Sequence, residues 1–298
     1  MTPDLPSTEQ VNPRSAELDL LPTRALVELL VSEQRGAVDA VFERATVLSA
    51  VAQRVAERLE RGGRLHYVGA GTSGRIGVLD AAEIPPTFGA DPRSVCAHVA
   101  GGAAALVRAI EGAEDDGDAG DAEMRAHVKA GDAVVGISAS GSAAYVVRAV
   151  ERAKRIGAFT VALVNAEHSP LAATAETAIV LATGPEALTG STRLAAGTAQ
   201  KIALNVLSTA IMVKLGKVYG NLMVDVVATN RKLRNRALRL VRMLTDADDE
   251  QARDLLERAG GNVKVAVVMR WRGIGPREAA NLLGGCGGSL RALAPRNR

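Results

Sequence analysis

The chain has 298 residues, of which 47% are hydrophobic, enough for one large core with a small appendage. The formal charge of +3 is spread along the chain and aromatic residues make up 2%, which argues against nucleic-acid binding. The polar N-terminus has no apolar signal core, and no apolar run reaches the ~18 residues of a membrane span, which predicts a cytoplasmic protein without a membrane partner. Two cysteines and four isolated histidines (His66, His98, His127 and His168) indicate neither a disulfide framework nor a metal centre.

The first expected elements are an extended arm over residues 1–15 and helices over 21–30 and 38–59. After residue 63, short β-branched runs alternate with helical patterns. Strands are expected at 65–68, 95–99, 133–137, 160–164 and 178–181, with intervening helices that include 103–112 and 143–156. This alternation predicts an α/β fold in which a parallel sheet is sandwiched by helices.

Strand signals end near Gly190, and the rest of the chain is predicted to be helical. Helices are expected at 197–215 and 224–244, followed by short ones at 249–259, 263–271 and 276–283 that enclose Trp271 as a core residue. The predicted organisation has four parts: an N-terminal arm with helices (1–48), a ligand-binding α/β domain (49–215), a connecting helix (216–244) and a small three-helix domain (245–298).

Two predicted strands end in loops rich in glycine and hydroxyl residues, GAGTSG at 69–74 and SASGS at 138–142. Backbone N–H groups, hydroxyls and the positive end of the next helix converge in such loops and favour a phosphate. One hydroxyl suffices for ordinary N-capping, and the second loop has three. The two loops predict a small phosphorylated metabolite as ligand. The candidate binding residues are Gly71, Thr72, Ser73, Ser138, Ser140, Gly141 and Ser142.

Two nucleotide-binding alternatives fit these loops poorly. Neither loop contains the lysine of a GxxxxGK[ST] loop. The first loop matches GxGxxG, but the second predicted strand ends in Ala-Gly-Gly, without the carboxylate that holds a ribose in dinucleotide-binding proteins.

Two acidic positions and one further loop complete the candidate site. Since proline disfavours helical backbone in the residue before it, the helix that opens at Ser73 is expected to stop before Pro85. Glu83 would then lie at the helix end, where the dipole disfavours an ionised carboxylate. The run EGAEDD at 111–116, which contains Glu114, is equally compatible with a solvated acidic turn. Ser191 precedes the helix at 197, where capping and ligand binding explain it equally well.

The motifs GAGTSGR–DAAEIPPTFG, IEGAEDD, SASGS–Y, TGSTRLAAGTAQK and GKVYGNLMVDVVATNRKL together resemble the N-acetylmuramic acid 6-phosphate etherase family. The resemblance implies a sugar isomerase (SIS) domain followed by a small UBA-like helical domain. It also implies a lyase that releases D-lactate from the ether of N-acetylmuramic acid 6-phosphate in the recycling of cell-wall amino sugars. The family works as a cytoplasmic homodimer with sites near the subunit boundary, and it uses no metal or organic cofactor.

By the same motif match, Glu83 takes the place of the catalytic proton donor and Glu114 that of a second active-site carboxylate. The resemblance leaves the division of acid and base roles between them open. The second loop departs from the family pattern, since this chain has ASGSAAY where ASGRTPY is usual. Ser142, Ala143 and Ala144 thus replace an Arg-Thr-Pro pattern. Because a cation is missing, weaker phosphate binding is expected.

Two other functions fit the same scaffold. The glucokinase regulatory protein shares the SIS domain and binds sugar phosphates without catalysis, and an aldose–ketose isomerase also abstracts a C2 proton. Glu83 favours the lyase over the regulator, because a regulator needs no carboxylate at that position. Release of lactate separates the lyase from the isomerase.

Overall fold

The computed structural model describes residues 5–226 and 231–295 of the chain. The chain divides into two compact units. The first comprises Met1–Ala81 and Arg93–Ser208, and the second comprises Ala82–Pro92 and Thr209–Arg298. Helices α4 (Gly71–Phe88) and α8 (Ala195–Lys214) pass from one unit into the other.

The first unit is built around a five-stranded parallel sheet with the strand order β2-β1-β3-β4-β5. Strands β3 and β4 are buried along their whole length, as expected for parallel strands covered on both faces. The predicted α/β fold is confirmed, and all five predicted strands are present, with each end at the predicted residue or one residue away from it. They are β1 (Leu65–Gly69), β2 (Val95–Val99), β3 (Ala133–Ser138), β4 (Phe159–Val164) and β5 (Thr177–Val180).

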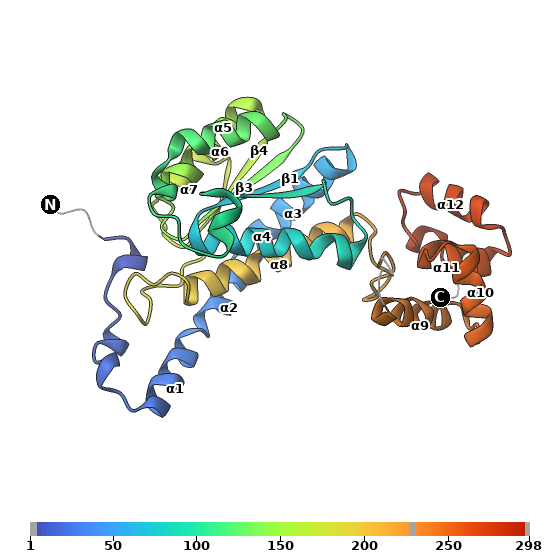
Figure 1. The fold of residues 1–298 in the computed structure, drawn as a ribbon, viewed down its shortest axis with the longest axis horizontal. Helices are drawn as coiled ribbons and strands as arrows, with labels where there is room; N and C mark the ends of the chain where they lie inside the picture. The colour runs from blue at the N-terminus through green and yellow to red at the C-terminus, as the bar shows by residue number, and fades with distance from the viewer. Residues whose placement is uncertain (1–4, 227–230, 296–298) are drawn as a thin grey trace. The chain divides into compact units, whose positions relative to one another are not determined.

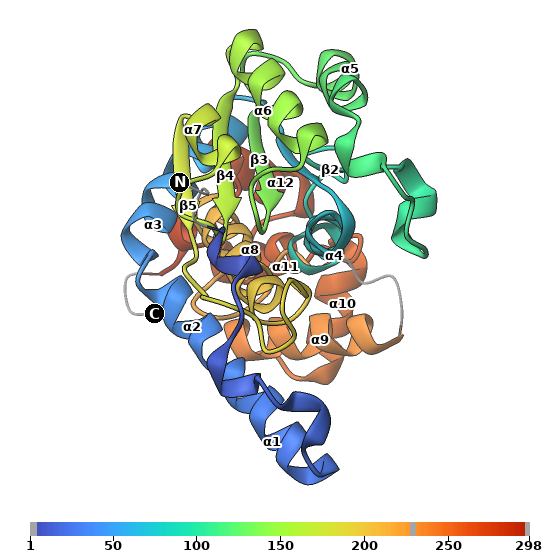
Figure 2. The same cartoon turned by 90° about the vertical axis from the view of Figure 1, so that its left-hand side faces the viewer.

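Helices form a layer on each face of this sheet (Figures 1 and 2). One layer holds α5 (Gly117–His127), α6 (Ala144–Ile156) and α7 (Pro170–Thr174), and the other holds α3 (Ala45–Glu60) with the first halves of α4 and α8. The chain steps from β1 to β2 in one direction and returns to β3 on the other side of β1. The strand order therefore reverses between β1 and β3, the point at which open α/β sheets bind ligands.

The N-terminal region holds three short 3-10 turns (Ser7–Glu9, Pro13–Ser15 and Leu18–Leu20) and the helices α1 (Thr23–Glu33) and α2 (Gly36–Phe42). The single helix expected over 38–59 is wrong, because the chain turns at residues 43–44 between α2 and α3. No glycine or proline marks this turn in the sequence. The Arg44 side chain donates to the carbonyl of Val180, 2.7 Å away, and so ties the turn to the end of β5.

The prediction that a helix ends before the proline pair is also wrong, because α4 includes both Pro85 and Pro86. These prolines remove two helical N–H donors, but the helix has only two further residues and the N–H of Gly89 still donates to the Pro85 carbonyl at 2.9 Å. Glu83 consequently lies five residues before the last residue of the helix rather than at its end.

The helix expected over 103–112 is replaced by two 3-10 turns, Gly102–Leu106 and Ala113–Asp115. Gly101 and Gly112 precede these turns with φ angles of 83° and 71°. Backbone in this left-handed region interrupts a helix, which explains the error. The helix of this segment is α5, which starts after Glu114 and which the sequence pattern did not indicate.

The second unit contains four further helices: α9 (Arg231–Thr245), α10 (Asp249–Arg258), α11 (Val263–Arg272) and α12 (Pro276–Gly285). The three short predicted helices match α10 to α12. The helix expected from residue 224 is wrong for residues 224–226, which form a turn, and residues 227–230 lie outside the described residues. Trp271 packs against the apolar core of this unit as predicted, and its indole N–H donates to the Leu244 carbonyl at 2.7 Å.

A buried lysine connects three segments of the second unit. Lys264 is 4% exposed, and its ammonium group donates to the carbonyls of Gly216 (2.8 Å) and Gly288 (2.7 Å) and to the carboxylate of Asp225 (2.6 Å). Burial lowers the pKa of Lys264, and the hydrogen bond to Asp225 opposes this shift. All three ammonium donors are therefore used.

We predict that Lys264→Met lowers the free energy of unfolding of the second unit by about 3 kcal/mol, because it leaves a carboxylate and two carbonyls without their shared donor. Hydrogen exchange of the α11 amides measures this loss. Lys232→Met, at an exposed position of α9, is the control and is expected to change stability by less than about 0.5 kcal/mol. Equal protection of α11 in both variants would contradict the assigned role.

Candidate functional site

The turn from β1 into α4 is built from glycines that leave no room for side chains. A Cβ atom on Gly69 would lie 2.7 Å from the Gly74 nitrogen, and one on Gly74 would lie 2.8 Å from the Gly69 oxygen. Because the first N–H groups of a helix have no carbonyl partner within it, those of Thr72 and Ser73 at the start of α4 have none in that helix. This loop can therefore offer backbone donors to an anion.

The loop between β3 and α6 uses its hydroxyls differently from an N-cap. The N-cap residue of α6 is Ala143, which has no side-chain capping bond. The Ser138 hydroxyl accepts from the N–H of Gly141 at 3.1 Å, and the hydroxyls of Ser140 and Ser142 lie 2.7 Å apart near the surface. Ordinary N-capping thus does not account for this loop, and its outer hydroxyls can bind a ligand.

Both loops leave the sheet at one place. Gly69, the last residue of β1, pairs with Ile137 near the end of β3. Neighbouring strands lie about 4.8 Å apart, so the two loops start side by side at the point where the strand order reverses. The arrangement suits a small ligand that carries an oxyanion.

The N-terminus of α8 is already occupied by a carboxylate that sequence analysis missed. Glu186, 1% exposed, accepts from the N–H groups of Ala195 (2.9 Å) and Ala196 (2.8 Å). Burial raises the pKa of Glu186, and these two hydrogen bonds oppose the shift. Capping therefore does not explain Ser191, which is half-buried in the preceding loop.

The two candidate catalytic carboxylates are exposed. Glu83 lies on α4 in the second unit, and Glu114 lies in the 3-10 turn Ala113–Asp115 of the first unit. Neither takes part in a hydrogen bond or ion pair among the described residues.

A second buried carboxylate, Asp80, is likewise absent from the sequence predictions. It is 4% exposed and accepts from Tyr67 (2.9 Å), Asn205 (2.8 Å) and Ser208 (3.0 Å). Burial raises the pKa of Asp80 and raises that of Tyr67 well above its ordinary value. These hydrogen bonds connect α4 to β1 and α8. They therefore fix how α4, which follows the first loop, is rotated about its own axis.

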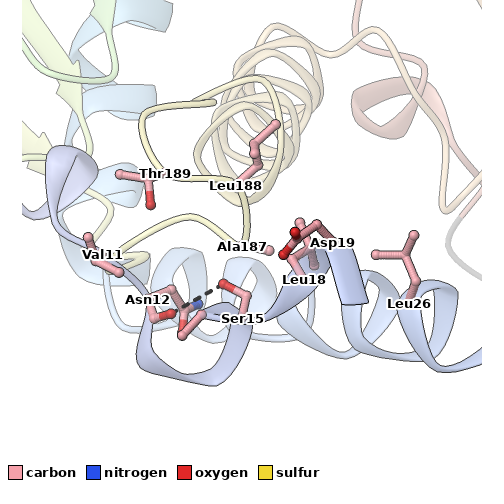
Figure 3. Close-up of a pocket in the computed structure, with 10 residues that line it drawn as sticks. Val11, Asn12, Ser15, Leu18, Asp19, Leu26, Ala187, Leu188 and Thr189 are labelled. Atoms are coloured by element: carbon pink, nitrogen blue, oxygen red, sulfur yellow. Dashed lines mark hydrogen bonds between the residues drawn. The ribbon is translucent and has the colours of Figure 1, made fainter. Parts of the chain in front are cut away.

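A cavity of about 420 Å³ lies between the N-terminal arm and the segment before Ser191 (Figure 3). The arm is held there by Asn12, whose side chain donates to Glu33 at 2.8 Å and to the Pro185 carbonyl at 3.3 Å. The cavity is mostly apolar. It is lined by Val11, Asn12, Ser15, Ala16, Leu18, Asp19, Leu26, Ala187, Leu188 and Thr189.

Three of the histidines that lie far apart in the sequence form one cluster in the structure. His66 contacts His98 (2.9 Å) and Asp132 (3.3 Å), and His98 contacts Glu123 at 2.8 Å. His127 lies 3.6 Å from the same Glu123 oxygen. The parallel pairing of β1 with β2 and the packing of α5 bring them together, which sequence spacing does not reveal. Among the described residues, no group of His, Cys, Asp and Glu is arranged to hold a metal ion.

The comparisons with known proteins agree with this geometry. Residues 46–154 match the model of the glucokinase regulatory protein N-terminal SIS domain, residues 113–210 match the SIS domain, and residues 237–269 match a UBA-like domain. The sheet with its paired loops therefore belongs to an SIS-domain protein with a UBA-like C-terminal segment.

Curated relatives narrow the class to one family. The chain is 51% identical over 287 residues to the N-acetylmuramic acid 6-phosphate etherase of Deinococcus radiodurans, covering 96% of this chain and 94% of the relative. The etherases of Trichormus variabilis (95% of this chain, 93% of the relative) and Streptomyces coelicolor (96% and 92%) are each 50% identical to it. The chain belongs to the N-acetylmuramic acid 6-phosphate etherase family, as its motifs predicted. Over its described residues it has no helix of the length and hydropathy that crossing a membrane requires.

The histidine cluster predicts a loss of stability in mild acid. Burial, with a smaller contribution from His98, lowers the pKa of His66 from 6.5 to about 4, although Asp132 opposes the shift. Between pH 6.5 and about pH 4, the unfolded chain therefore binds a proton at residue 66 that the folded chain does not bind. Stability contributed by neutral His66 is complete above pH 6.5 and is lost as the pH falls towards 4, by about 3 kcal/mol.

Urea unfolding of wild type and His66→Gln between about pH 7 and about pH 4 measures this contribution of His66 to the free energy of unfolding. The wild type is expected to be more stable at neutral pH, with a difference that narrows as the pH falls. His168→Gln, at an exposed position, is expected to follow the wild type throughout. A difference that stays constant with pH would contradict the prediction.

Proposed function

We propose that this chain is a carbon–oxygen lyase that cleaves the lactyl ether of N-acetylmuramic acid 6-phosphate. The products are N-acetylglucosamine 6-phosphate and D-lactate. The observation that carries the proposal is the 51% identity over 96% of the chain to a relative named for this activity. The same relatives argue against the regulatory protein and the sugar-phosphate isomerase as alternatives.

The chemistry needs only proton transfers. In the open-chain sugar, C1 is an aldehyde, so the C2 proton is acidic and the C3 ether lies β to the carbonyl. A base removes the C2 proton while the C3–O bond breaks, and an acid protonates the departing lactate oxygen. Water then adds to C3 of the unsaturated aldehyde and a proton returns to C2. A carboxyl group that is partly protonated can serve in either direction.

The roles proposed for the residues rest on the sequence motifs and on the two loops at the end of the sheet. The phosphate at C6 is held at the ends of β1 and β3, and this anchor fixes C2 and C3. Glu83 is the catalytic proton donor and Glu114 the second carboxylate, as the family motifs imply. The binding residues of the proposal are Gly71, Thr72, Ser73, Ser138, Ser140, Gly141, Ser142 and Ser191.

The proposal extends to organisation and location. The chain comprises an N-terminal arm with helices (1–48), an SIS domain (49–215), a connecting segment (216–244) that contains most of α9, and a UBA-like domain (245–298). It works in the cytoplasm in cell-wall amino-sugar recycling. It acts as a homodimer. An exposed apolar face supports this, formed by Val27 and Val31 on α1 and by Val38 and Phe42 on α2, which are 52–79% exposed. Each pair is four residues apart and so shares one face of its helix.

We predict that Glu83→Gln lowers the rate of lactate release about 10³-fold, because the amide cannot donate a proton to the leaving oxygen. Binding of N-acetylglucosamine 6-phosphate is expected to stay within about twofold of wild type, since the phosphate anchor is intact. Lactate release from N-acetylmuramic acid 6-phosphate measures the first effect, and isothermal titration with N-acetylglucosamine 6-phosphate measures the second.

Two further variants make this test specific. Ser140→Ala removes an anchor shared by ground and transition states, so it is expected to raise KM and leave kcat nearly unchanged. Glu60→Gln, at an exposed position of α3, is expected to behave as wild type. Retained turnover in Glu83→Gln would refute its role, and a wild-type protein that releases no lactate would refute the proposed function.

The homodimer predicts that Phe42→Asp raises the dissociation constant of the dimer about 30-fold, because a charge would be buried in the interface. Sedimentation velocity across a concentration series measures this constant. Met243→Asp, which replaces an exposed apolar residue of α9, is the matched control. A wild-type monomer, or a Phe42→Asp protein that dimerises as well as wild type, would contradict the assignment of this face.

A further inference from the structure

A chain of buried hydrogen bonds runs beneath the first loop of the site. The Ser73 hydroxyl donates to Oε1 of Gln200 at 2.8 Å, and Nε2 of Gln200 donates to Oδ1 of Asn165 at 3.0 Å. Nδ2 of Asn165 donates to the Leu181 carbonyl at 3.0 Å and to the Thr183 hydroxyl at 3.2 Å. Gln200 is 0% and Asn165 is 1% exposed, so water does not substitute for these partners.

The backbone fixes the direction of every bond in this chain. A carbonyl oxygen only accepts, so Leu181 requires the NH₂ group of Asn165 to face it. Oδ1 of Asn165 then faces Gln200 and requires its NH₂ group in turn. Oε1 of Gln200 is left facing Ser73, so the hydroxyl must donate. The single proton of Ser73 is thereby directed inward, and only acceptor lone pairs remain for a ligand.

The same residues connect the two loops of the site. The N–H groups of Asn165 and Ala166 both donate to the carbonyl of Ala139, at 2.9 and 3.1 Å, at the start of the second loop. Asn165 thus holds the second loop with its backbone and, through Gln200, holds Ser73 in the first loop with its side chain. A change at Gln200 therefore affects both the direction in which the Ser73 hydroxyl donates and the position of Ser73.

We propose that Gln200 and Asn165 are positioning residues that set Ser73 as a hydrogen-bond acceptor toward the substrate. This inference rests on the proposed function. A phosphate dianion has only acceptor oxygens, so the Ser73 side chain does not bind it and contributes its backbone N–H there instead. The Ser73 oxygen accepts from a donor of the sugar, a hydroxyl or the acetamido N–H.

Gln200→Glu tests whether the bond from residue 200 to Asn165 holds Ser73 in position. A neutral carboxylic acid has the shape of the amide and donates to Asn165, but a carboxylate places an acceptor against Oδ1 of Asn165. The ratio of KM between variant and wild type is expected to be near one at about pH 6 and about tenfold at about pH 9, since burial delays ionisation. Gln251→Glu, in the capping box of α10 where glutamate is equally suitable, is the control and should show no such change.

A structural role alone predicts a different result. Loss of folded protein lowers the apparent kcat and leaves KM unchanged, so thermal unfolding of each variant is recorded at the same pH values. A KM ratio that does not vary with pH would overturn the proposal. If wild type releases no lactate, the proposed function fails, and the Kd for N-acetylglucosamine 6-phosphate then replaces KM as the readout for Gln200.

A double-mutant cycle tests whether Gln200 acts through Ser73. Ser73→Ala and Gln200→Leu are each expected to raise KM about tenfold, because each removes the oriented acceptor. The double variant should have the KM of Ser73→Ala within about twofold, since no hydroxyl remains to be oriented. Increases that multiply to about a hundredfold would show independent roles and would overturn the proposal.

Discussion

The parallel pairing of β1 with β3 is the constraint on which the site depends. It makes β1 the strand at which the sheet order reverses, since β2 lies on its other side. The loops that leave β1 and β3 therefore start next to each other, while α4 and α6 depart to opposite faces. An order that placed another strand between β1 and β3 would separate the two loops. We propose that their glycines and hydroxyls act on one ligand rather than on two.

Buried polar groups keep these loops in place. Asp80, Glu186 and the Gln200 side chain are almost completely buried, and each is hydrogen-bonded by more than one partner. Because an unpaired polar group in such a place costs about 1 to 3 kcal/mol, each network has essentially one stable arrangement. A site that must hold a small sugar in one orientation benefits from such rigidity, since the loops need no rearrangement when the ligand binds.

Sequence patterns predicted the sheet and both loops because these features are local. A β-branched run followed by glycines and serines is readable within ten residues. Errors occur where a distant contact or a few backbone angles decide, as at Arg44, Gly101 and Gly112. The polar networks were not predictable for the same reason. Ser73 and Gln200 are 127 residues apart in the chain, and no pattern in either segment indicates the other.

The exposure of Glu83 and Glu114 connects the proposed chemistry with the proposed homodimer. An acid that protonates a leaving oxygen near neutral pH must be partly protonated, and removal from water is the usual cause. A single chain leaves both carboxylates in water, so shielding has to come from the substrate, from the second chain or from both. If the second chain supplies it, dissociation at the α1–α2 face would lower kcat as well as binding. Catalysis would then depend on protein concentration, which a site complete within one chain does not show.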